Sequence, residues 1–250
     1  MLVYSHPVTV AVASIFAQPY VPMSFAASFL LLTAYFALVV KSGMAESEKQ
    51  VSWLLTLASS LVCTLMGLPN FYYFWRSGWD LLLFDHDSVA QTALVCFFIV
   101  YLVLDLSLGS VFYRRRITIL TGWVHHTAYI VILLWFLHRR ISSFFAMASI
   151  LELPTLILAI GSLKKKWRSD LLFAASFFLL RLVLHICMIF MLRRYRRVDT
   201  LWMIAVAVLP LHLFWFYCIV NLHARKLRFT KDRCITTCNE SRNRFPVLAA

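Results

Sequence analysis

Long apolar runs, separated by short polar and basic segments, dominate the hydrophobic pattern of the chain. A membrane core about 30 Å thick is crossed by roughly 20 residues of α-helix, at about 1.5 Å per residue. Seven runs with almost no charge reach that length: 21–40, 51–69, 88–110, 117–137, 142–163, 171–192 and 200–222. The pattern therefore predicts an all-α, polytopic membrane protein with about seven transmembrane helices.

The composition excludes a soluble globular domain. Of the 250 residues, 62% are hydrophobic and 14% are charged, against roughly 45–50% and 25% in soluble proteins. The formal net charge of +13 would suit a nucleic-acid-binding protein, but the basic residues form short clusters between the apolar runs. That placement is typical of membrane proteins. We expect membrane lipids as partners and no nucleic acid, with a homo-oligomer left open.

The basic clusters also predict an orientation in the membrane. When the seven runs alternate in direction, one side collects 16 Lys and Arg residues and the other side collects seven. Because cytoplasmic segments carry the excess of Lys and Arg, we expect the C-terminus in the cytosol. The predicted organisation is an N-terminal segment with the first transmembrane helix over 1–50, a membrane domain over 51–225 and a basic cytosolic tail over 226–250.

Three charged side chains lie inside the apolar runs: Asp105, Glu152 and Arg181. A charge in a membrane span costs about 3 kcal/mol on insertion scales, so it normally faces the interior of a helical bundle and has a partner there. Residues three or four positions apart share one face of a helix. The polar groups identified by that spacing are Tyr101 with Asp105, His125 and His126 with Tyr129, Glu152 with Thr155, Arg181 with His185, and His212 with Trp215.

Four of these side chains lie about nine to twelve residues into their runs: His126, Glu152, Arg181 and His212. At about 1.5 Å per residue, that depth is near the membrane midplane. Polar groups at one depth in successive helices are satisfied most easily around a shared central cavity, which predicts a functional site. The alternative is structural pairing, such as Glu152 with Arg181 and Asp105 with a histidine, that only holds the bundle together.

As a set and in this order, the polar residues resemble the TLC domain that TRAM-type proteins, ceramide synthases and related lipid-homeostasis proteins share. The pair His125-His126 is preceded by Tyr101-x3-Asp105 and followed by Glu152-Leu153-Pro154-Thr155, Arg181 and His212-x2-Trp215. The resemblance covers roughly residues 50–225. It implies six helices in a barrel around a central cavity, often with an extra N-terminal span, and a location in the endoplasmic reticulum.

Within that family, the chain is closer to the small TLC-domain lipid-homeostasis proteins than to the ceramide synthases. The synthase motif has Asp-Phe before the two histidines and Thr three residues after them. Here residues 117–124 contain no Asp-Phe, and Tyr129 stands three residues after His126. The resemblance therefore implies a protein of lipid homeostasis that binds or handles a lipid, with acyl-CoA-dependent acyl transfer as the alternative.

These two interpretations give the polar residues different roles. In an acyltransferase, His125 or His126 would be the general base or the nucleophile, and Asp105 or Glu152 would orient the imidazole. Acyl-CoA would be a co-substrate, with no other cofactor and no metal. Haem ligation by the histidines is a third interpretation, which their spacing does not favour. The candidate residues for contact with a lipid or its headgroup are Tyr101, Tyr129, Thr155, Arg181, His212 and Trp215.

Overall fold

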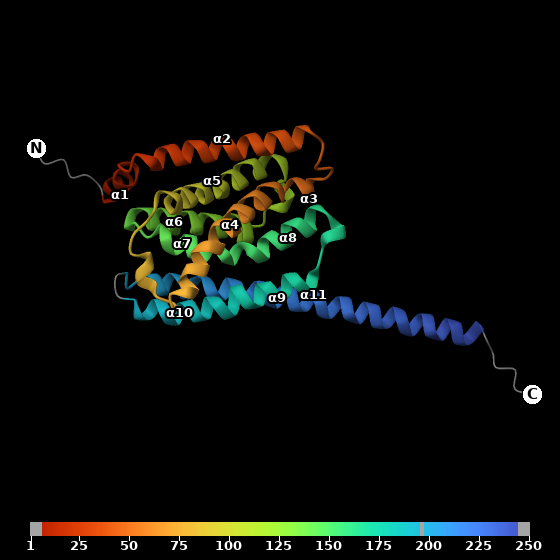
Figure 1. Ribbon diagram of the computed structural model, residues 1–250. Helices are drawn as coiled ribbons and strands as arrows, with labels where there is room; N and C mark the ends of the chain where they lie inside the picture. The colour runs from red at the N-terminus through yellow and green to blue at the C-terminus, as the bar shows by residue number, and fades with distance from the viewer. Residues whose placement is uncertain (1–6, 196–197, 245–250) are drawn as a thin grey trace, which may run out of the picture. The chain divides into compact units, whose positions relative to one another are not determined.

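The computed structural model describes residues 7–195 and 198–244, and each element over those residues is a helix (Figure 1). The chain divides into two compact units, Met1–Ser176 and Phe177–Ala250. This boundary falls inside the membrane domain predicted for 51–225. The organisation into 1–50, 51–225 and 226–250 stays a prediction.

The first unit contains five long helices joined by short helical segments. The long helices are α2 Tyr20–Lys41, α4 Leu54–Arg76, α5 Val89–Phe112, α6 His125–Arg139 and α8 Leu153–Leu163. The short segments are α1 Pro7–Phe16, α3 Glu48–Val51, η1 Leu81–Phe84, η2 Arg114–Arg116, η3 Ile119–Val124, α7 Ser142–Ala148, η4 Ser149–Glu152 and η5 Lys165–Trp167. Helix α9, Asp170–Phe177, reaches the boundary of the unit.

The second unit is a pair of helical segments. The π-helix η6, Phe178–Leu184, continues directly into α10, His185–Arg194. Helix α11, Leu201–Arg244, packs against both. The two arms of this helical hairpin, η6–α10 and α11, carry the polar residues that the sequence places in the sixth and seventh runs.

Six helical segments among the described residues are long and apolar enough to cross a membrane. They are Tyr20–Lys41, Glu48–Arg76, Val89–Phe112, Ser142–Leu163, Asp170–Arg194 and Leu201–Arg225. Large apolar side chains such as Leu30 and Leu38 of α2 are exposed, as contact with lipid requires. The all-α prediction is confirmed over the described residues, and the six apolar helices are compatible with an integral membrane protein. The run predicted at 117–137 corresponds to η3 and α6, which are not among the six.

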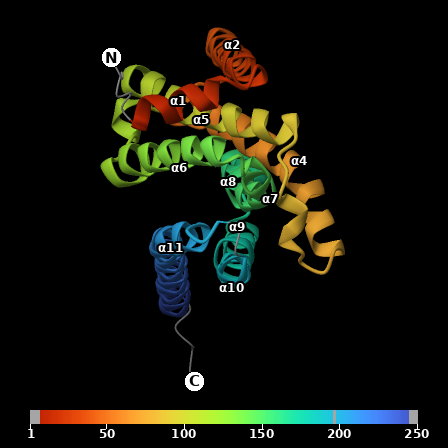
Figure 2. The same ribbon diagram turned by 90° about the vertical axis from the view of Figure 1, so that its left-hand side faces the viewer.

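Helix α5 lies at the centre of the first unit. Its apolar segment is 72% buried, the largest share among the six candidate spans. It contacts α2, α4, α6 and α7, and Figure 2 shows it between α2 and α6. A capping box formed by Ser88 and Gln91 begins the helix. Polar side chains on the inner faces of α5 are therefore held away from lipid.

The segment that carries Glu152 lies close against α4. A Cβ atom on Gly67 would be 2.5 Å from the backbone nitrogen of Ile150, so a larger residue there would push η4 away from α4. The Ser149 hydroxyl donates a hydrogen bond of 2.9 Å to the Cys63 carbonyl. These contacts fix the position of η4 beside α4.

The carboxylate of Asp87 fixes the start of α7. It accepts hydrogen bonds from the backbone N–H groups of Ser142 and Ser143, at 2.8 and 2.9 Å. A carboxylate at a helix N-terminus satisfies donors that have no partner inside the helix. The Ser143 hydroxyl also donates to the Phe84 carbonyl at 2.7 Å. The loop before α5 is thereby joined to the segment α7, η4 and α8, in which Pro154 occupies the first turn of α8.

Helix α4 extends beyond the predicted run at 51–69. It continues past Pro69 and ends at Arg76. A proline inside a helix removes one backbone hydrogen bond, but surrounding contacts can maintain the helix beyond it. One such contact is the hydrogen bond of 2.9 Å from Gln91 Nε2 to Asn70 Oδ1, which joins this end of α4 to α5.

Candidate functional site

One face of α5 carries a polar stripe with a spacing of four residues. Its members are Tyr101 and Asp105; Gly109 continues the same spacing, and Tyr113 follows directly after the helix. Residues four positions apart lie above one another on a helix. The stripe therefore brings two tyrosines to opposite sides of one carboxylate, along the axis of the most buried helix.

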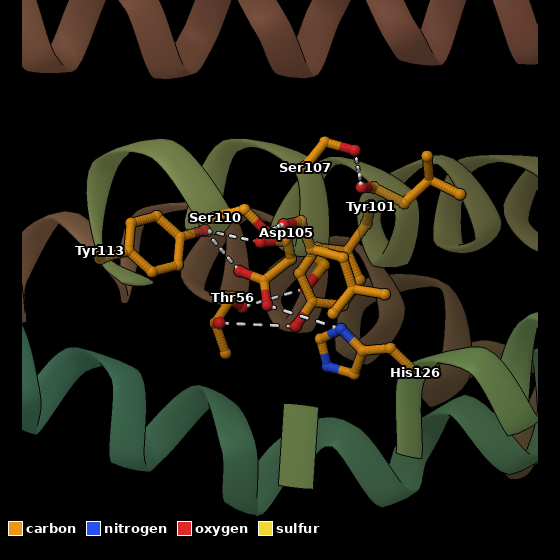
Figure 3. A network of polar contacts seen from close by, with 10 residues as sticks. Thr56, Tyr101, Asp105, Ser107, Ser110, Tyr113 and His126 are labelled. Carbon is orange, nitrogen blue, oxygen red and sulfur yellow. Dashed lines mark hydrogen bonds and ion pairs between the residues drawn. The ribbon is translucent and has the colours of Figure 1, made fainter. Parts of the chain in front are cut away.

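The two carboxylate oxygens of Asp105 contact different side chains (Figure 3). The Tyr113 hydroxyl donates a hydrogen bond of 2.7 Å to Oδ1 and lies 3.3 Å from the Asp105 carbonyl oxygen. Oδ2 lies 3.5 Å from Nδ1 of His126, which comes from the first turn of α6. Asp105 thus lies between a hydrogen-bond donor and an imidazole.

His126 is buried, with 7% of its surface exposed. It has a hydrogen bond with the backbone of Leu102. Its Nδ1 atom is buried and has no hydrogen-bond partner among the described residues. The 3.5 Å to Asp105 Oδ2 is an ion-pair distance and is longer than a good hydrogen bond of about 3 Å. A polar ring atom beside a carboxylate, inside an apolar helix bundle, is therefore left without a hydrogen bond.

Tyr113 is a hydrogen-bond donor in this arrangement. It is 2% exposed and is the first residue after α5. Burial, and then the nearby charge of Asp105, raise the pKa of the Tyr113 hydroxyl above its usual range. The hydroxyl therefore keeps its proton and can donate it to the Asp105 carboxylate as a hydrogen bond.

Helices α4 and η4 complete the cluster around Tyr101. The Tyr101 hydroxyl lies 3.4 Å from Thr56 Oγ1, and the Ser59 side chain lies near it. The charge of Glu152 interacts electrostatically with both Tyr101 and His126. Four segments of the first unit, α4, α5, α6 and η4, thus supply side chains to one polar cluster, which we call the Asp105 cluster.

The other predicted residues of the first unit lie beside this cluster. His125 is half-buried, with its ring centroid 4.5 Å from that of Tyr129 and 5.6 Å from that of His126. Thr155 is half-buried in the first turn of α8, directly after the segment with Glu152. The His126 ring lies 3.5 Å from the Asp105 carboxylate, which makes His126 the stronger candidate of the two adjacent histidines for acid–base chemistry.

A second polar cluster lies inside the second unit. Arg181, His185 and His212 are each at least 94% buried. His212 Nε2 is 3.3 Å from Arg181 Nη1, and His212 Nδ1 is 3.0 Å from the Arg181 carbonyl oxygen and 2.8 Å from His185 Nδ1. The rings of Phe177 and Trp215 lie 5.8 and 6.0 Å from the Arg181 guanidinium carbon. We call these residues the Arg181 cluster.

The contacts of His212 define the tautomers in the Arg181 cluster. A carbonyl oxygen only accepts, so His212 Nδ1 carries the hydrogen, and its Nε2 lone pair accepts from the Arg181 guanidinium. His185 Nδ1 then presents a lone pair to His212, and His185 has a further hydrogen bond with the Ala205 backbone. Both ring nitrogens of His212 are satisfied when both histidines are neutral.

A π-helical segment precedes a histidine in each unit. The segment η3 ends directly before His125, and η6 contains Arg181 and ends directly before His185. Wide helical turns of this kind are rare and are frequently found at functional sites. This feature was not visible in the hydrophobic pattern.

The predicted residues therefore form two groups. The structure brings Tyr101, Asp105, His126 and Glu152 together in the first unit, and Arg181, His212 and Trp215 together in the second. The single shared cavity and the pairing of Glu152 with Arg181 stay predictions. Sequence reasoning missed Tyr113, Thr56 and Ser59. The four-residue spacing after Asp105, through Gly109 to Tyr113, was a signal that could have identified Tyr113.

Comparisons with known proteins give no relative of this chain. No protein-family model matches it, and neither the curated proteins nor the solved structures include a match. Within the part of the chain that the structure describes, no group of three or more His, Cys, Asp or Glu side chains is arranged to hold a metal ion.

Proposed function

We propose that this chain is a multi-pass membrane protein of TLC type that acts in lipid homeostasis by binding or handling a lipid in an intramembrane polar cavity. The observation that carries the proposal is the Asp105–His126 pair. An acid and an imidazole, 3.5 Å apart, lie among apolar helices, and one buried ring nitrogen has no hydrogen bond from the described residues. Ionisable groups at such positions are costly and usually serve a function.

The proposal includes the finer architecture that the resemblance implies. Segments η3 and α6 would be the additional span, giving seven in all, with six helices forming the barrel around the cavity. The protein would reside in the endoplasmic reticulum with the basic tail 226–250 in the cytosol, as the excess of Lys and Arg on that side favours.

The orientation can be tested at a glycosylation sequon, Asn239-Glu240-Ser241. A cytosolic tail does not meet the glycosylation machinery, so we expect Asn239 to stay unmodified. Expression in microsomes, followed by glycosidase treatment and mass measurement, checks this. A glycosidase-sensitive mass shift that disappears in Asn239→Gln would contradict the proposed orientation.

The Asp105 cluster suits a headgroup with a hydroxyl or amine. Its carboxylates, on Asp105 and Glu152, attract such a donor, and the Tyr101 hydroxyl and the His126 ring can complete its hydrogen bonds. The proposed lipid would thus place its polar end at this cluster and its acyl chains between the apolar helices. The headgroup role that the sequence predicts for Arg181, His212 and Trp215 stays a prediction.

Native mass spectrometry of the full chain, released from lipid nanodiscs, tests lipid binding directly. We expect wild-type protein to retain a bound lipid, and His126→Asn and Asp105→Asn to retain less of it. The matched control is Ser107→Ala, because Ser107 lies on α5, is exposed and bonds its own helix at Val103. Equal retention by wild type and both site variants would contradict the proposal.

Acyl transfer from a thioester donor is a second candidate function, favoured by the position of Asp105 beside His126. A carboxylate beside an imidazole is the arrangement that orients a general base. His126 would take the proton of a lipid amine or hydroxyl as its nitrogen or oxygen attacks the acyl carbonyl. The carbon–sulfur bond of the acyl-CoA would then break, and the proton would pass to the leaving thiolate.

Release of free CoA from acyl-CoA by the reconstituted protein tests this second candidate. If His126 is the base, His126→Asn should lower the rate by about 10²–10⁴-fold. If a histidine is instead the nucleophile, an acylated protein should accumulate when the acceptor is omitted. No CoA release with any lipid acceptor would leave lipid binding as the function of the cluster.

A further inference from the structure

We infer that Tyr113 is a positioning residue whose hydroxyl holds the Asp105 carboxylate in the orientation that faces His126, and that Gly109 provides the space for its ring. The importance of this orientation rests on the proposed function of the Asp105 cluster. The geometry itself is independent of that function, because it follows from the contacts of α5 and α6.

The Tyr113 side chain folds back along α5. The backbone N–H of Tyr113 donates to the Gly109 carbonyl at 3.0 Å, and the helix ends there. The ring then runs toward Asp105, eight residues earlier, and its hydroxyl donates to Oδ1 at 2.7 Å. At 2% exposure, the ring is surrounded on all sides, so the hydroxyl has a fixed position relative to Asp105.

Gly109 is required for this path. A Cβ atom at Gly109 would lie 2.7 Å from Cε2 of the Tyr113 ring and would also overlap Cδ1 of Ile117. Both contacts are too short for carbon atoms, so an alanine at this position would displace both the Tyr113 ring and the Ile117 side chain. Gly109 and Tyr113 therefore act together to position the Asp105 carboxylate.

One bonded oxygen determines where the other oxygen points. The last torsion of an aspartate side chain is broad, so a carboxylate turns easily unless an oxygen is held. With Oδ1 bonded to Tyr113, the plane of the carboxylate is set, and Oδ2 faces His126 Nδ1 at 3.5 Å. Without the hydroxyl, the carboxylate can turn away, and the imidazole loses the carboxylate oxygen that lies 3.5 Å from its Nδ1 atom.

The ¹⁵N signals of the His126 ring report this orientation independently of lipid binding. The full chain is labelled at histidine nitrogens and reconstituted in lipid nanodiscs, and His126 is assigned from the signals that vanish in His126→Asn. We expect Tyr113→Phe to shift the Nδ1 signal in the same direction as Asp105→Asn. The control Tyr73→Phe removes a hydroxyl from a tyrosine that is 67% exposed and should leave the signal unchanged.

Gly109→Ala gives a second route to the same displacement. It should shift the Nδ1 signal in the direction of Tyr113→Phe. When Gly109→Ala is combined with Tyr113→Phe, it should add little to the shift of the Nδ1 signal, because the tyrosine hydroxyl is already absent. Additive shifts would mean that Gly109 acts on the cluster by another path and would overturn its part in the inference.

Lipid retention separates this inference from the proposed function. Tyr113→Phe should retain lipid more weakly than wild type, by up to about tenfold, because the hydrogen bond that holds the Asp105 carboxylate is worth about that ratio. A wild-type Nδ1 signal in Tyr113→Phe, with a shifted signal in Asp105→Asn, would overturn the positioning role. A shifted signal with unchanged retention in Tyr113→Phe, Asp105→Asn and His126→Asn would confirm the positioning role and reject the proposed function.

Discussion

The Asp105 cluster and the Arg181 cluster use similar side chains but satisfy them differently. Each combines a charged group, buried histidine and an aromatic wall. In the Arg181 cluster both ring nitrogens of His212 have hydrogen-bond partners. In the Asp105 cluster Nδ1 of His126 has none among the described residues, although it is buried and faces a carboxylate. Residue type alone does not distinguish a satisfied network from one that contains an unsatisfied ring nitrogen.

The charges of the two clusters also differ in sign. Asp105 and Glu152 make the first cluster acidic. The second unit has a guanidinium at Arg181 and no Asp or Glu over residues 177–194 or 201–225, and its histidines accept and donate as neutral rings. The acidic cluster suits general-base chemistry or a headgroup that donates hydrogen bonds. The satisfied imidazoles of the second unit favour a role in holding α10 against α11.

The largest expected effect is the loss of function in His126→Asn. Asparagine is polar and of similar size, so we expect a folded, inserted protein that no longer restores the lipid composition of a null strain. If the step is catalytic, the loss is about 10²–10⁴-fold. Lipid profiles at matched expression check this. A normal profile in both His126→Asn and His125→Asn would show that these imidazoles are structural and would remove the contrast between the clusters.

The next effect is the loss of stability in His212→Ala. Removing a ring that is 1% exposed also removes its contacts with the Arg181 guanidinium and carbonyl, and the loss of a buried hydrogen-bond partner costs about 1–3 kcal/mol. We expect a lower melting temperature in detergent than for His126→Ala. We also expect the loss of bound lipid per folded molecule to be smaller than in His126→Asn. The opposite ranking in both measurements would reverse the roles given to the two clusters.

The smallest of these effects is expected in Asp105→Asn. The amide keeps the shape of the carboxylate and can still accept from Tyr113, but it removes the charge beside His126. The defect in lipid composition should therefore be in the same direction as for His126→Asn and weaker. A defect stronger than that of His126→Asn would show that the carboxylate contacts the ligand directly and that the imidazole only supports it.

The sequence by itself determined the class of the molecule and the most unusual side chains in it. Runs of about 20 apolar residues specify membrane helices because the bilayer core has a fixed thickness and provides no partners for a backbone outside a helix. Asp105, Glu152 and Arg181 stood out because charge is rare and costly in such runs. The pairing of Tyr101 with Asp105 followed from helical spacing, which is a local property of the chain.

Tertiary structure decided which of these side chains meet. The contact between Asp105 and His126 joins α5 to α6, and the approach of Glu152 depends on a glycine in α4, so neither follows from spacing along one helix. Tyr113 lies beyond the predicted run, and it belongs to the cluster only because its ring folds back over Gly109. Distances between helices likewise decide that the ring nitrogens of His212 have hydrogen-bond partners and that Nδ1 of His126 has none among the described residues. A hydrogen bond requires atoms about 3 Å apart, and the sequence does not specify that distance.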